Sequence, residues 1–145
     1  ALDLFSQARE IGPKDPGVAA VTGGVYAVFA DRLPKEYRNA AWSQAYDSYQ
    51  GLWKQQGAMV DRLPVHMRGE LLGGLAMSAI RTGRTEEAMR HLDKIIAALA
   101  NTPYEPVAKK WKENPKAAAN TSITCMTCHD QGRLAARLNS LNGAK

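Results

Sequence analysis

Apolar residues recur at intervals of three and four along most of this chain, the spacing that places side chains on one face of a helix. Such a face is clearest in residues 34–53, where the apolar positions are Ala41, Trp42, Ala45, Tyr46, Tyr49, Leu52 and Trp53. Polar residues occupy the other faces, so this stretch predicts an amphipathic helix that begins at Pro34 or Lys35. The apolar run 17–30 is shorter than the ~20 residues that cross a bilayer, and it predicts a buried helix instead.

Residues 69–99 predict two further helices, separated by a turn at 82–84. Gly83 can adopt the left-handed backbone conformation that ends many helices. Thr85 is the expected N-cap of the second helix, and the two glutamates after it suit the positive end of the helix dipole.

Two glycine pairs occupy equivalent places in the chain. Gly23 and Gly24 lie in the first apolar run, and Gly73 and Gly74 lie at the corresponding place in the hairpin that follows. Two successive helical hairpins would produce this repetition. Because each glycine costs about 1 kcal/mol inside a helix, each pair predicts that another stretch of backbone passes close by.

The overall pattern favours helices throughout. No segment alternates apolar and polar residues with a period of two, so no sheet is expected. A chain of 145 residues, 45% apolar and 23% charged, has the size and composition of one globular domain. The predicted fold class is all-α, with helical hairpins forming a bundle in a single domain, residues 1–145, whose C-terminal helix carries the cysteine motif described next.

Both cysteines of the chain fall in one short motif, CMTCH, at residues 125–129. On a helix, Cys125, Cys128 and His129 project from the same face. Two thiols that can form thioethers with vinyl groups, next to a histidine that can bind iron, are the c-type haem attachment motif. The motif predicts one covalently bound haem c per chain, with His129 as the proximal axial ligand.

Three other readings of the two cysteines remain open. A structural zinc site usually takes four protein ligands, and the chain has no further cysteine. A dithiol redox motif belongs at a strand-to-helix turn of an α/β fold, which is not predicted here. A disulfide across a two-residue gap would constrain little of the unfolded chain.

A mostly helical chain of this length with a single CxxCH near its C-terminus resembles the cytochrome c′ group of four-helix cytochromes. Arg133, four residues after His129, matches a basic residue that commonly follows the motif in that group. The second hairpin also resembles a tetratricopeptide unit at Leu72, Leu75, Ala76, Ala79, Ala88 and Leu92. Covalent haem attachment in bacteria occurs outside the cytoplasm, so the resemblance implies a periplasmic protein. A chain that begins at Ala1 fits a mature form whose signal peptide has been removed.

The ligand on the other side of the iron decides between electron transfer and binding of small gases. The candidates outside the motif are Met59, His66, Met67, Met77, Met89 and His91. Met59, His66 and Met67 fall in a connection that contains glycine and proline, and these three are the preferred alternatives because a loop can place a ligand where a helix cannot. The other two methionines occupy apolar helical positions typical of core packing, and the remaining histidine is expected on a partly exposed face.

A five-coordinate iron is the alternative to a sixth protein ligand. The distal face would then be apolar, lined by residues such as Leu4 or Phe5. An iron of this kind favours nitric oxide or carbon monoxide.

A basic cluster precedes the motif. Lys109, Lys110, Lys112 and Lys116 surround Trp111. Positive charge near a haem edge can speed encounter with an acidic redox partner, whereas a solvated helix face with Trp111 packed inward is the plainer interpretation. The formal charge of +5 is spread among interspersed acidic and basic residues without a recognition motif, so nucleic acid is not an expected partner.

The sequence therefore predicts a periplasmic one-electron carrier with no membrane-spanning segment, in a layout compatible with a homodimer. The alternatives are a five-coordinate gas-binding cytochrome and a haem-bearing module whose hairpin binds another protein. Enzymatic turnover is not expected, since no catalytic constellation is visible, and haem peroxidase activity is the one enzymatic alternative left open.

Overall fold

The structure is a computed structural model that describes residues 2–12 and 15–124, apart from the side chains at positions 2, 5, 6, 8 and 9. Its elements are α1 (Leu2–Ile11), α2 (Pro16–Ala30), α3 (Lys35–Gln56), the 3₁₀ helix η1 (Gly57–Arg62), α4 (Val65–Arg81), α5 (Thr85–Ala98), α6 (Tyr104–Glu113) and the 3₁₀ helix η2 (Pro115–Ala119). No strand occurs in these ranges. The prediction of an all-α bundle is confirmed.

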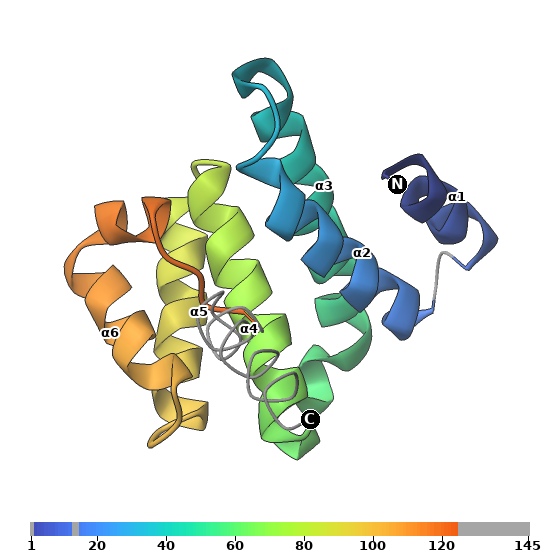
Figure 1. Ribbon diagram of the computed structural model, residues 1–145. Helices are drawn as coiled ribbons and strands as arrows, with labels where there is room; N and C mark the ends of the chain where they lie inside the picture. Colours follow the sequence, from blue (N-terminus) through green and yellow to red (C-terminus); the bar gives the residue numbers. More distant parts are fainter. Residues whose placement is uncertain (1, 13–14, 125–145) are drawn as a thin grey trace, which may run out of the picture.

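Consecutive helices pack against one another along the chain. The pairs α2 with α3 and α4 with α5 form two hairpins, and contacts between α3 and α4 join them. Figure 1 shows α6 on the outer side of α5 and α1 beside α2 at the opposite end of the molecule. The two hairpins expected from the repeated glycine pairs are therefore present. Within the described residues, no helix is both long and apolar enough to span a membrane.

Helix ends follow local sequence signals in most places. Asp15 caps α2, since its Oδ1 accepts a hydrogen bond of 2.9 Å from the Val18 N–H. Gly83 has a φ of +79° and ends α4, as predicted. The N-cap prediction at Thr85 is wrong by one residue. The Arg84 N–H bonds to the Ala79 carbonyl, which closes the turn earlier and leaves Thr85 as the first helical residue.

Helix α2 is only partly buried, which corrects the expectation of a buried helix. Its inner face includes Tyr26 and Ala30, whereas Val21 is 56% exposed and Phe29 is 41% exposed. The reason is its position near one end of the bundle, where α3 and part of α4 cover one side. An apolar face of α2 remains uncovered by the other described helices.

The core is built around α4, in which residues 71–79 are all buried. Tyr49 of α3 is fully buried beside it, with its ring packed against Gly23 of α2 and Gly74 of α4. A Cβ at Gly74 would overlap this ring. The glycines at positions 23 and 74 thus receive a side chain, which corrects the prediction that backbone passes close at both pairs. That prediction is right at Gly73, whose neighbour is the carbonyl of Ile123.

Gly74→Ala is expected to lower the free energy of unfolding by about 1–3 kcal/mol, because the added methyl displaces the Tyr49 ring from a close-packed site. Gly51→Ala on α3 is the matched control. No atom lies within 4 Å of its would-be Cβ, so it should be neutral or stabilising by up to ~1 kcal/mol. Urea denaturation measures both, and equal effects of the two substitutions would contradict this account of the glycine pair.

Candidate functional site

The motif residues Cys125, Cys128 and His129, together with Arg133, lie outside the described residues, as does any helix that carries them. The described chain ends one residue before the motif, at Thr124. The described parts of the site are the segment that leads to Thr124 and the surface around that residue. Of the two proposed distal residues on α1, Leu4 is 68% exposed, and the side chain of Phe5 is not described.

Residues 121–124 cross α4 in the direction opposite to the helix. The Ser122 hydroxyl lies 3.8 Å from the Met77 sulfur, and the Ile123 carbonyl sits against Gly73, one turn earlier in α4. Thr124 borders a pocket together with Glu70, nearly one turn earlier again. From Ser122 to Thr124 the chain thus runs along α4 toward the N-terminus of that helix.

This crossing segment is held at both ends of its path. Trp111 is fully buried, and its Nε1 donates a hydrogen bond of 2.7 Å to the Thr121 hydroxyl. Ile123 is also fully buried and Thr124 is 4% exposed. A side chain at Gly73 would collide with the Ile123 carbonyl, so this glycine is what lets the segment approach. The residue that precedes the motif therefore has a fixed place on α4.

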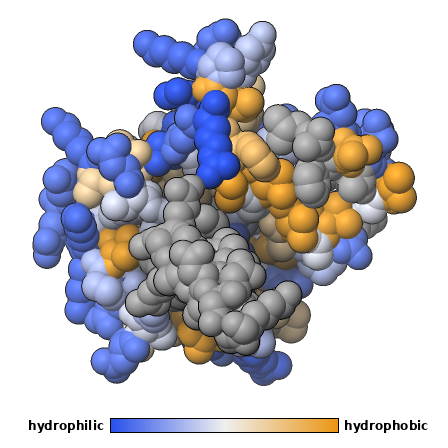
Figure 2. Space-filling model, viewed as in Figure 1, coloured by the Kyte–Doolittle hydropathy of each residue, from blue (hydrophilic) through white to orange (hydrophobic). Residues whose placement is uncertain are grey.

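An apolar groove lies beside Thr124. One part of it is lined by Ala20, Val21, Gly24, Val25 and Val28 of α2, with Glu70 and Thr124. A second part, lined in addition by Leu63, His66, Met67 and Leu71, shares Ala20 and Glu70 with the first. We call this continuous surface the α2–α4 groove. Figure 2 shows the apolar atoms gathered over α2. Small residues one turn apart on α2 leave the hollow, and valines form its walls.

Glu70 is the charged residue at the centre of the α2–α4 groove. It was not among the site residues predicted from the sequence. Its Oε1 accepts a hydrogen bond of 2.6 Å from the Tyr49 hydroxyl, which fixes the carboxylate beside the core. In the sequence it resembles an ordinary surface glutamate of a helix. The signal that could have identified it is its spacing of three and four residues from the glycine pair, because those positions share one helix face.

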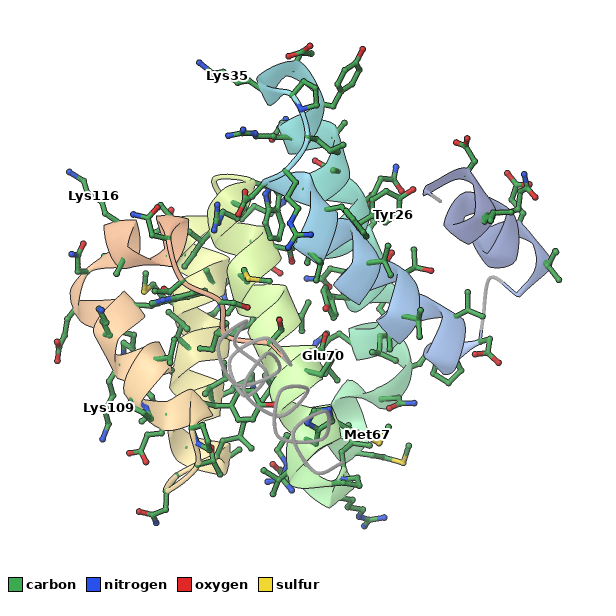
Figure 3. The ribbon with its side chains drawn as sticks, viewed as in Figure 1. Tyr26, Lys35, Met67, Glu70, Lys109 and Lys116 are labelled. Atoms are coloured by element: carbon green, nitrogen blue, oxygen red, sulfur yellow. The ribbon has the colours of Figure 1, made fainter. Side chains whose placement is uncertain are left out.

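The preferred distal candidates lie in ordered helical turns and not in an open loop, which corrects the sequence interpretation. Met59 lies in η1, while His66 and Met67 occupy the first turn of α4 after Pro64. His66 and Met67 line the α2–α4 groove, one turn of helix from Glu70. Met67 and Glu70 are labelled on α4 in Figure 3. Met59 is 49% exposed and does not line it. The structure thus brings two of the three candidates to the groove.

The remaining candidate iron ligands pack in or against the hydrophobic core. Met77 is 4% exposed, as expected for a packing methionine, although its sulfur contacts Ser122. His91 is 6% exposed, which contradicts the prediction of a partly exposed face. Its ring meets Trp53 edge to face at 5.7 Å, and its Nε2 lies 3.6 Å from Glu87 Oε1. This histidine is buried because its helix face packs toward α3. No group of three His, Asp or Glu side chains within the described ranges could hold a metal ion.

The four lysines around Trp111 are exposed on α6 and η2. Lys109 pairs with Glu105 at 2.6 Å, and Lys112 pairs with Asp93. Figure 3 shows Lys109 and Lys116 on the outer side of this region, away from Glu70. Trp111 itself packs inward, so the plainer interpretation of the cluster holds for the tryptophan. Docking through Lys109, Lys110, Lys112 and Lys116, and a place for Trp111 near the haem, stay predictions.

Comparisons of the chain with protein-family models, with curated proteins and with solved structures find no match. The resemblances to the cytochrome c′ group and to a tetratricopeptide unit therefore rest on the motif, the layout and the residue pattern alone. The structure adds an apolar groove beside Thr124, the last described residue before the CMTCH motif.

The burial of His91 predicts a pH-dependent stability. Burial lowers the pKa of His91 below its ordinary value of 6.5, against an opposing effect of Glu87. The unfolded chain then takes up a proton before the folded one, so the stabilisation is present above about pH 6.5 and is lost as the pH falls through the folded pKa.

Urea unfolding from about pH 7 to about pH 5 should show a shallower loss of stability in His91→Gln than in the wild type. An NMR titration that places the pKa of His91 at or above 6.5 would contradict the assignment.

Proposed function

We propose that this chain is a periplasmic monohaem c-type cytochrome that carries single electrons. Haem c is bound through Cys125 and Cys128, with His129 as the proximal ligand of the iron. The observation that carries the proposal is the CMTCH motif, supported by the position of Thr124 at the edge of an apolar groove. When bound, the group supplies the change between ferric and ferrous iron.

The described residues fit a haem next to Thr124. The macrocycle is flat and largely apolar, and the uncovered face of α2 offers Val21, Val25 and Val28 around a hollow at Gly24. Val21 is 56% exposed, and burial of such a side chain contributes roughly 1.5–3 kcal/mol when it is complete. An apolar wall also excludes water and so lowers the local dielectric around the iron, a lever on the reduction potential.

The crossing segment 121–124 suits an electron carrier because it gives the attachment point a fixed place. Trp111 holds Thr121 and Gly73 admits Ile123, so the residue before Cys125 has little freedom to move. A rigid site keeps the surroundings of the iron alike in both oxidation states. The basic residues of α6 remain the proposed contact with an acidic partner protein.

A five-coordinate gas-binding cytochrome is the second candidate. The observation that favours it is the wall nearest Thr124, which consists of valines and small residues without an iron-ligating side chain on α2. His66 and Met67 lie farther along the α2–α4 groove, one turn beyond Glu70. The two candidates differ in whether either of these side chains reaches the iron.

Haem attachment is tested by expressing the chain with a c-type maturation system and measuring the intact mass. We expect a gain equal to one haem, since thiol addition to a vinyl group releases nothing. The Cys125→Ser and Cys128→Ser double variant should lose the covalent haem, whereas Met126→Leu, a change of a spacer residue, should keep it. An unmodified wild-type chain, made where a reference cytochrome matures, would refute the proposal.

Absorption spectra of the ferric protein test the distal ligand. A carrier with a sixth ligand is low-spin, and one of His66→Ala and Met67→Leu should convert it almost completely to high-spin. Met59→Leu is the control, because Met59 lies outside the α2–α4 groove. A wild-type protein that is high-spin and binds nitric oxide or carbon monoxide readily would exclude the carrier and favour the gas-binding candidate.

A further inference from the structure

A cleft lined by charged as well as apolar side chains adjoins the α2–α4 groove at Thr124. It is lined by Asp31, Arg32, Trp42, Met77 and Arg81, and by residues 119–122 and Thr124. Its volume is about 280 Å³, far more than the ~10–15 Å³ that a cavity needs to hold one water molecule. Val28 and Thr124 line both the cleft and the groove, so the apolar and polar surfaces are continuous.

Arg81 is fixed at the wall of this cleft with donors to spare. Its Nη1 forms an ion pair of 2.9 Å with Asp31 Oδ1, and its guanidinium carbon lies 5.1 Å from the centre of the Trp42 ring. The same carboxylate oxygen accepts a hydrogen bond of 3.0 Å from Trp42 Nε1. The guanidinium carries five N–H donors, and the ion pair with Asp31 occupies the Nη1 end. Its Nε is buried without a hydrogen-bond partner among the described residues.

Arg32 adds a positive charge that Asp31 does not offset. Its guanidinium carbon lies 5.9 Å from the centre of the Phe29 ring, and within the described part of the chain it forms no ion pair with an acidic side chain. Asp31 already pairs with Arg81. The cleft therefore has room, a net positive charge and guanidinium groups, the group that binds carboxylates in a bidentate way.

We infer that this cleft binds the carboxylate edge of the haem, with Arg32 and Arg81 as the groups that hold it. The inference rests on the haem attachment proposed above. Haem is an apolar ring with two propionate groups on one edge, and the surface next to Thr124 has the matching division. The valines of α2 meet the ring, and one turn beyond Val28 lies Arg32. The two arginines are positioning residues for the cofactor.

The reduction potential of the attached haem tests the inference in the full-length protein. Ferric iron carries one more positive charge than ferrous iron, so an arginine at the propionates favours the ferrous form. Arg32→Gln and Arg81→Gln should each lower the potential, and Arg32→Lys should restore part of the loss. Spectra that report axial ligation should stay unchanged, because the cleft acts on the carboxylate edge. Arg32 is exposed and outside the core, so its variant is expected to fold even if the Arg81 variant does not.

Arg84→Gln is the matched control. Arg84 also lies over an aromatic ring of α3, with its guanidinium carbon 4.1 Å from the centre of the Tyr46 ring, but it does not line the cleft. It removes the same charge, so a shift specific to the cleft must exceed the shift in this control. Shifts in the Arg32 and Arg81 variants no larger than the control would overturn the inference while the haem attachment stands. A wild-type chain that takes up no haem would overturn both.

Discussion

The ring of Tyr49 lies where α2, α3 and α4 meet, and both neighbouring helices have a glycine at the point of contact. A methyl group at Gly74 would occupy the place of the ring, so the separation of α3 and α4 depends on that missing side chain. The Tyr49 hydroxyl then reaches the edge of the core and hydrogen-bonds to Glu70. One buried tyrosine thus sets the packing of three helices and orients the carboxylate at the centre of the α2–α4 groove.

Gly73, next to Gly74, gives α4 a second contact. Gly73 receives the backbone of Ile123, and the segment that leads to Cys125 therefore lies against the helix that forms one wall of the groove. Helix α4 therefore contacts both the core tyrosine and the segment before the motif. The face at Gly74 organises the bundle, and the face at Gly73 fixes the point from which the motif begins. The apolar side of α2, left uncovered by its position near the end of the bundle, supplies the opposite wall.

The sequence predicted the parts of the fold that depend on local pattern. The helix after Pro34, the left-handed Gly83 and the two hairpins all follow from apolar spacing and turn chemistry. The parts that depend on which faces meet could not be predicted. Flanking charges suggested that His91 is exposed, yet its face packs toward α3, and the apolar run of α2 gave no sign that one side lacks a neighbour.

For the candidate site, the sequence offers a prediction of the chemistry and no prediction of its surroundings. CMTCH indicates haem from residue types and spacing, and this motif lies outside the described residues. Its surroundings come from residues far apart in the sequence, such as Val21, Glu70 and Thr124, which no local pattern connects. The same holds for the cleft, where Arg32 and Arg81 belong to different hairpins and line one cavity with Asp31 and the crossing segment.

The central claim is that a covalent haem lies on the apolar face of α2 beside Thr124. Paramagnetic NMR of the ferric protein, with methyl-labelled valines, tests it most directly. The methyl signals of Val21, Val25 and Val28 should be shifted or broadened relative to the diamagnetic protein, while those of Val107 on α6 should change little. Strong effects at Val107 with unperturbed methyl signals from the three valines of α2 would contradict the account.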